Sequence, residues 1–344
     1  MRIAIIPIVS SLHHDQGINQ ETKKLLDDIK DLGPFEFVVG KDGTEDLTLI
    51  LVQSGGSEGL FLKMEEELEP PYYLLTYGSN NSLAASMEIL SYLKDKGEIA
   101  QILHGTPNYI AKQLLELGST NSKPSINLGV IGKPSDWLIA SNVDYHFVKN
   151  RMNIQLIDID IQELIDLYHV VDVSDYETST ELVFNEKSVK EAKKVSLSLR
   201  RLVDKYHLEG LTIRCFDLLD SIHTTGCLGI SLLNRDRLIG TCEGDIPAML
   251  SMYLLKQITG QSGFQANPSR IDTDKNHIVF AHCTLPLDMA ENYQLMTHFE
   301  SGIGVGIRGK MKSSDITLFK IHRNLKDYYV AEGKIIENLE EDNL

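Results

Sequence analysis

The feature that most constrains this 344-residue chain is a regular alternation of short apolar runs with amphipathic segments. In the first third, apolar runs lie at 3–9, 47–52, 72–77 and 98–103, and amphipathic segments lie at 20–32 and 83–94. Short strands that alternate with helices are typical of βαβ units and a parallel sheet. Small polar loops follow the apolar runs, and in such sheets the loops after the strand carboxyl ends bind ligands.

A second α/β pattern begins after residues 119–125, a polar stretch that we interpret as a linker. From about residue 303 the pattern changes to alternating apolar and polar residues, which favours antiparallel β structure. We therefore predict an α/β fold with two Rossmann-like parallel-sheet domains and a short antiparallel β-rich C-terminal segment. The expected boundaries are an N-terminal domain at 1–122, a central domain with the site at 123–285, and a partial β-rich domain at 286–344.

Charge and cysteine content narrow the function classes. The chain has 33 Lys+Arg against 49 Asp+Glu, a net charge of −16, which disfavours binding to nucleic acid or to an anionic membrane. It contains no apolar run of about 18 residues, so we expect no membrane span. The apolar N-terminus lacks the features of a signal peptide, and the four cysteines lack C-x-x-C spacing. These features indicate a reduced, cytoplasmic protein.

Three polar residues lie at predicted strand ends in the second half: Glu243, Asn267 and His282. A carboxylate, an amide oxygen and an imidazole suit Mn²⁺ or another divalent cation, with positions left open for substrate oxygens. Each residue also has a plainer interpretation. Glu243 can be a turn carboxylate near a helix N-terminus, Asn267 a turn initiator, and His282 a core histidine.

These motifs, in this order, resemble the L-fucose isomerase and L-arabinose isomerase superfamily. The segment 212–255 is similar to the family's central domain, with a Cys-Glu-Gly-Asp turn before an apolar helix. The sequence Ala-His-Cys-Thr-Leu-Pro at 281–286 resembles the family's strand that ends in a metal-binding His, and 298–320 resembles its His-x-x-Gly-Ile-Gly-Gly segment. The resemblance covers about 212–320. It implies a Mn²⁺-dependent aldose–ketose isomerisation of a sugar through an ene-diol.

The resemblance assigns roles to individual residues. Glu243 matches the family's first carboxylate, a metal ligand and acid/base, and His282 matches its first His ligand. The family's second carboxylate is expected at 264–267, where this chain has no acid. Asn267 can supply only a carbonyl oxygen to a metal, so the general base is expected to be Asp217, Asp245, Asp272 or a group that the sequence does not identify. The family's final His ligand also has no clear match. Two alternatives stay open: a non-catalytic sugar-binding or regulatory protein on this scaffold, and a periplasmic-type sugar-binding fold.

Further residues are expected to contact the sugar. The resemblance implies a homo-oligomer, a trimer or hexamer, whose active site is completed by a neighbour's N-terminal loops. In this chain those loops supply Ser10, Ser11, Asn80 and Asn81. In the second half we expect contacts from Trp137, as a stacking platform or a packing residue, from Arg214, which could bind an anionic substituent, and from His298, which opens the third family-like segment.

Overall fold

The structure is a computed structural model and describes residues 1–11, 16–121, 125–174 and 185–341. The chain divides into two compact units. The first is built from the described residues of 1–124 together with 150–153, and the second from those of 125–149 and 154–344. The separate prediction of a third domain beginning at 286 stays a prediction.

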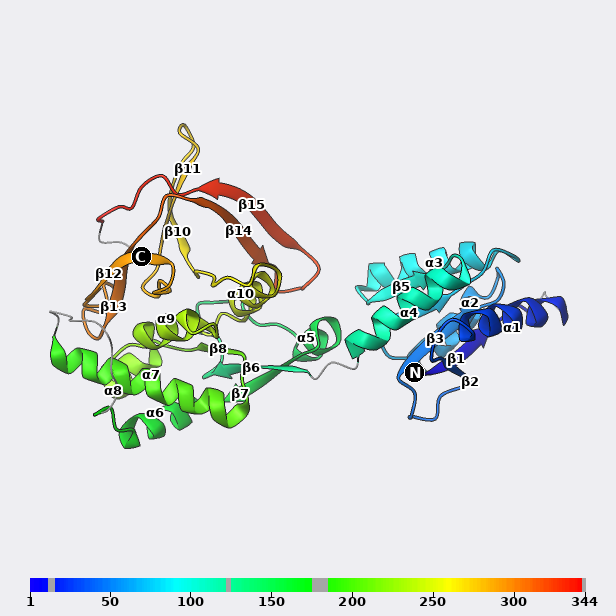
Figure 1. Cartoon of the computed structure of the whole chain (residues 1–344), viewed down its shortest axis with the longest axis horizontal. Helices are drawn as coiled ribbons and strands as arrows, with labels where there is room; N and C mark the ends of the chain where they lie inside the picture. The colour runs from blue at the N-terminus through cyan, green and yellow to red at the C-terminus, as the bar shows by residue number, and fades with distance from the viewer. Residues whose placement is uncertain (12–15, 122–124, 175–184, 342–344) are drawn as a thin grey trace. The chain divides into compact units, whose positions relative to one another are not determined.

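The first unit contains a five-stranded parallel sheet with the order β2-β1-β3-β4-β5 (Figure 1). Its strands are β1 (Arg2–Ile8), β2 (Glu36–Val39), β3 (Leu47–Val52), β4 (Tyr72–Leu75) and β5 (Ala100–Leu103). Its helices are α1 (Gln16–Lys30), α2 (Glu58–Met64), the short 3₁₀ helix η1 (Glu65–Glu67), α3 (Ser82–Lys96) and α4 (Pro107–Asn121). Helices α1 and α4 contribute to one apolar cluster with the sheet, and α2 and α3 to another. Both faces of the sheet are therefore covered, as its near-continuous apolar strands require.

The second unit contains a four-stranded parallel sheet with the order β7-β6-β8-β9. Its strands are β6 (Ile126–Ile131), β7 (Ile154–Ile159), β8 (Gly210–Ile213) and β9 (Ile239–Cys242). Its helices are α5 (Tyr145–Met152), which ends in residues grouped with the first unit, α6 (Ile161–Val170), α7 (Glu186–Tyr206), α8 (Asp217–Ile222), α9 (Cys227–Arg235) and α10 (Ile246–Thr259). Helix α7 buries one face, including Val195, Leu199 and Leu202, as its apolar spacing predicts.

Three antiparallel hairpins follow α10 in the chain. They pair β10 (Asn267–Asp272) with β11 (His277–Ala281), β12 (Ala290–Met296) with β13 (Gly306–Met311), and β14 (Asp315–Ile321) with β15 (Tyr328–Lys334). Figure 1 shows them above the parallel sheet of the same unit. The predicted fold class, two parallel α/β sheets followed by antiparallel β structure, is confirmed.

One detail of the prediction was wrong. Residues 119–121 belong to the end of α4, so the polar stretch at 119–125 is not a linker from its first residue. The predicted strand ends near 267 and 282 belong to a separate hairpin, in which β10 and β11 pair with each other. None of the described helices is long and apolar enough to cross a membrane.

Candidate functional site

The site is organised by the sharp turn between β9 and α10. Glu243 and Gly244 both have left-handed backbone angles, with φ of 64° and 71°. The amide of Gly244 donates to the carbonyl of Ile213 at the end of β8, at 3.0 Å. A left-handed backbone raises the conformational energy of a residue with a side chain, such as Glu243, so the packing and hydrogen bonds around the turn have to hold it in place. The turn places Glu243 at the carboxyl edge of the parallel sheet, where α/β folds bind ligands.

The Glu243 carboxylate has two described side-chain partners. The indole Nε1 of Trp137 donates a hydrogen bond to Oε2 at 2.9 Å. On the other side, Nε2 of His282 lies 3.9 Å from Oε1. The amide of Ser135 also donates to the carbonyl of Glu243, at 2.9 Å, which ties the 132–137 loop to the turn. A carboxylate from one sheet and an imidazole from a separate hairpin therefore meet at one place.

The environment of His282 favours its charged form. Its side chain is only 5% exposed, and Nδ1 lies 2.9 Å from Thr284 Oγ1. Burial alone would lower the pKa of His282, but the hydrogen bond to Cys283 and the negative charges of Cys283 and Glu243 outweigh it, so the pKa is raised. A cationic His282 next to a carboxylate can donate a proton or a hydrogen bond to an oxygen atom of a ligand.

Aromatic rings continue the site away from the carboxylate. The ring of Trp137 contacts Phe216 edge-on at 5.2 Å between centroids, and Phe216 contacts the ring of His298 at 6.2 Å. Trp137 is 55% exposed, whereas His298 is buried at 5%. Trp137 thus combines a packing contact with an exposed surface that a sugar ring can cover.

All four cysteines of the chain lie near this site. The sulfur atoms of Cys227 and Cys283 are 3.3 Å apart, and those of Cys215 and Cys242 are 3.1 Å apart. Hydrogen bonds from the thiols of Cys227 and Cys242 hold the pKa of Cys283 well below its usual value. The pKa values of Cys227 and Cys242 are raised by their thiol hydrogen bonds to the neighbouring cysteines and by burial. Cys283 is therefore the thiol of these three that loses its proton most readily.

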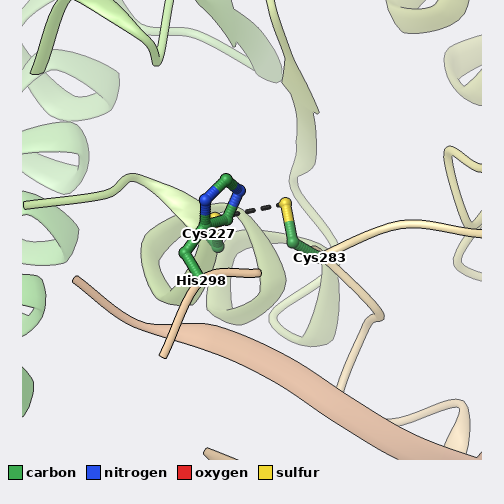
Figure 2. A group of neighbouring side chains, drawn as sticks. All are labelled: Cys227, Cys283 and His298. Carbon is green, nitrogen blue, oxygen red and sulfur yellow. Dashed lines mark hydrogen bonds between the residues drawn. The ribbon is translucent and has the colours of Figure 1, made fainter. Parts of the chain in front are cut away.

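One set of these side chains could hold a metal ion. The ligand atoms of Cys227, Cys283 and His298 all lie within 4.8 Å of one another (Figure 2). The sequence alone did not predict this group. Its members come from the start of α9, from the residues after β11 and from the β12–β13 connection, so no local spacing joins them. Only the cysteine and histidine content of 227–298 could have suggested it.

Other predicted residues have different environments. Asn267 is exposed at the first position of β10, opposite Ala281 in the hairpin. From the same segment, it is Gln265 that contacts β9, where its Oε1 accepts from the amide of Cys242 at 2.7 Å. Asp245 caps α10 by accepting from the amide of Ala248 at 3.0 Å, which gives it a structural role at the helix N-terminus.

Asp217 and Arg214 belong to an ion-pair group at the edge of the site. Arg214 donates to Asp217 at 2.9 Å and binds both carboxylate oxygens of Asp136, at 3.1 and 2.9 Å. The hydrogen bonds and the charge of Arg214 lower the pKa of Asp136. Arg214 is therefore already neutralised by two carboxylates, which makes it a poor binder of an anionic sugar.

The predicted contacts from the N-terminal loops lie in the first unit. The amide of Ser10 donates to Ser54 Oγ at 2.9 Å, and Ser11 is exposed in a turn. Asn80 and Asn81 follow β4 with left-handed φ values of 54° and 55°. These residues follow the carboxyl ends of β1 and β4 in the parallel sheet, as predicted. Residues 12–15, the continuation of the first loop, lie outside the described part of the chain.

Comparison with curated proteins finds relatives that carry the same name, sulfoquinovose isomerase. No protein family model matches the chain. Curated sulfoquinovose isomerases from Alkalicoccus urumqiensis and Priestia aryabhattai are 22% and 21% identical to it over 281 and 279 residues. A third, from Clostridium sp. (strain MSTE9), is 34% identical over a short stretch of 74 residues, 21% of this chain and 17% of that protein. The chain is similar to sugar isomerases. The first two alignments cover 75% of this chain but 63% of each relative's length.

Proposed function

We propose that this chain is an aldose–ketose isomerase of a sugar, with Glu243 as the acid/base residue. The observation that carries the proposal is the approach of His282 to the Glu243 carboxylate, at 3.9 Å, on the carboxyl edge of a parallel sheet. The similarity to named sulfoquinovose isomerases supports the same reaction class.

The proposed chemistry needs one proton carrier and one group that stabilises negative charge. The C2 hydrogen of an aldose is a weak acid, so its removal builds charge on the two adjacent oxygens. Glu243 takes this proton and charged His282 gives its proton to O1, so that an ene-diol forms. The O2 hydroxyl proton then passes to His282 while the carboxylic acid of Glu243 returns its proton to C1, which gives the ketose. His282 in its charged form donates to the oxygens of the ene-diol, and the Trp137 hydrogen bond holds the carboxylate in place.

The expected Mn²⁺ fits the described residues only in part. Glu243 and His282 lie close enough to share a ligand, but Asn267 is exposed at the start of β10. Mn²⁺ prefers oxygen-rich ligands, whereas the group of possible ligands that includes Cys283, the neighbour of His282 in sequence, consists of two thiols and an imidazole. The described residues do not form the predicted Mn²⁺ set, so the proton transfer is argued from Glu243 and His282 alone.

We further propose that the substrate carries an anionic substituent, as the name of the relatives suggests. Arg214 is occupied by two carboxylates, so a different cation should bind the anion. Lys133 is exposed in the loop that packs on Gly244, where its carbonyl lies next to the glycine Cα. Its position beside the Glu243 turn makes Lys133 the favoured partner for a sulfonate or a similar group.

The test is hydrogen exchange at C2. The chain is incubated in deuterated water with sulfoquinovose, or with glucose as an aldose without the sulfonate, and NMR follows deuterium uptake and ketose formation. Glu243→Gln should lower the exchange rate by about 100-fold or more, since acid/base residues contribute about 10²–10⁴. Glu291→Gln, which removes an exposed carboxylate on β12, is the matched control and should retain the wild-type rate.

Three outcomes separate the alternatives. Full exchange in Glu243→Gln would refute the role of this carboxylate. Binding of the sugar without any exchange in the wild type would indicate the non-catalytic sugar-binding protein instead. Equal rates with glucose and sulfoquinovose would refute the anionic substituent. The expected trimer or hexamer and the cytoplasmic location stay predictions, of which light scattering tests the first.

A further inference from the structure

Three side chains from separate elements of the second unit converge beside the Glu243–His282 pair. Cys227 is the first residue of α9, Cys283 follows the end of β11, and His298 follows the end of β12. Their ligand atoms all lie within 4.8 Å of one another, and the two sulfurs are 3.3 Å apart. We propose that Cys227, Cys283 and His298 bind a zinc ion and leave one coordination position open.

The donor types select the metal. Two sulfurs and one imidazole nitrogen suit Zn²⁺ and disfavour Mn²⁺ and Mg²⁺, which prefer oxygen. Three protein ligands with a fourth position free are the arrangement of zinc sites that bind water or substrate. With Zn–S bonds of about 2.3 Å, a tetrahedral site separates its sulfurs by roughly 3.8 Å. The sulfurs of Cys227 and Cys283 therefore need to move apart by about half an ångström, which a side-chain rotation can supply.

The surroundings of His298 fix its orientation. The amide of Ser301 donates to Nδ1 at 3.2 Å, and the Ser301 hydroxyl lies 2.9 Å from the same nitrogen. Nε2 is then the nitrogen available to a metal. Zinc binding at Nε2 moves the ring proton to Nδ1, so the Ser301 amide has to give up its hydrogen bond to Nδ1 and the Ser301 hydroxyl becomes the acceptor of the Nδ1 proton. Phe216 packs edge-on against the same ring and restricts its rotation further.

The plainer interpretation is that these cysteines only pack in the core, since thiols behave as small apolar groups. Cys227 is 2% exposed and His298 is 5% exposed, so both are removed from bulk water. Packing does not require an imidazole beside two thiols at this depth, because a buried imidazole carries a desolvation cost. The metal site stands on these three side chains, whereas any use of it in the isomerisation rests on the proposed function.

The test measures metal binding by the full chain. The protein is dialysed against Zn²⁺ and then against metal-free buffer, and the bound zinc is measured by inductively coupled plasma mass spectrometry. Wild-type protein should retain one Zn²⁺ per chain. Cys227→Ala and Cys283→Ala should each weaken zinc binding by more than about 100-fold, since even loss of an outer partner costs about 10- to 100-fold. Cys215→Ala removes a comparably buried thiol outside the set and should bind zinc like the wild type.

Because a cysteine variant can fail to fold, a second measurement uses the wild-type chain alone. Addition of Co²⁺ to the wild type should produce the near-ultraviolet thiolate-to-cobalt absorption and the visible bands of a tetrahedral ion. Absence of these bands, absence of retained zinc, or equal zinc binding by Cys283→Ala would overturn the proposal. Zinc binding in a chain that shows no sugar isomerisation would refute the proposed function and leave the metal site standing.

Discussion

Replacement of Gly244 by alanine tests how the turn positions the carboxylate. Gly244 has a φ of 71°, and an added Cβ would lie 2.3 Å from the carbonyl oxygen of Lys133 and 2.6 Å from the Cα of Pro134. Both contacts are with backbone, which cannot rotate away. The 133–134 backbone would have to move by about 1 Å to reach an ordinary contact distance.

The expected cost has two parts. A left-handed backbone costs alanine about 1–2 kcal/mol. Movement of the loop also weakens the hydrogen bond from the Ser135 amide to Glu243 and that from Arg214 to Pro134, at about 1 kcal/mol each. Gly244→Ala should therefore lower the free energy of unfolding by about 3–4 kcal/mol. Gly260 has nearly the same φ, 67°, with nothing within 4 Å of an added Cβ, so Gly260→Ala should cost only about 1–2 kcal/mol.

The assay uses the only tryptophan of the chain, Trp137, which lies in the displaced loop. Urea unfolding followed by its fluorescence reports the stability of the second unit around the turn. The Gly244 variant should also lose isomerase activity, because the hydrogen bond from Trp137 to the Glu243 carboxylate depends on the same loop. Equal destabilisation by Gly244→Ala and Gly260→Ala would show that the backbone contact with Lys133 is unimportant and would refute the reasoning.

Two further predictions concern the same loop. Trp137→Phe keeps an aromatic ring but removes the donor to Glu243, so kcat should fall by about 10-fold, the value of one charge-assisted hydrogen bond, in steady-state kinetics; an unchanged kcat would contradict the positioning role. Arg214→Met should destabilise the protein at neutral pH, as measured by urea unfolding across a pH series. Because Arg214 lowers the folded-state pKa of Asp136, this stabilisation is present above the unfolded pKa of about 3.9 and is lost as pH falls through the lower folded value. The difference between wild type and variant should therefore shrink below about pH 4, and a constant difference would contradict this account.

The candidate site contains two groups of side chains, whereas the sequence predicted a single metal site of a carboxylate, an amide oxygen and an imidazole. Glu243 and His282 form the proposed acid/base pair, and the thiols of Cys227 and Cys283 with His298 supply sulfur and nitrogen donors in the same unit. The relatives are named as sulfoquinovose isomerases, yet at 21–22% identity their metal ligands cannot be transferred to this chain. Metal analysis of this chain is therefore the most direct next measurement.

The sequence determined the local features of this protein. Apolar runs with polar ends predicted the buried strands β1, β3 and β6, and the spacing of apolar residues along 187–206 predicted the buried face of α7. The turn after β9 was also predictable. Asp before an apolar helix with proline in its first turn is a helix start, so Glu243 had to lie at the strand-to-helix turn.

Only the tertiary structure decided which of these local features meet. His282 approaches Glu243, whereas Asn267, at the start of the paired strand, is exposed. Cys227, Cys283 and His298 come together across 72 positions of sequence, counted from 227 to 298, and no periodicity encodes that contact. The physical reason is that strand and helix patterns arise from interactions between near neighbours, while the pairing of hairpins and the packing of loops depend on burial summed over the whole unit.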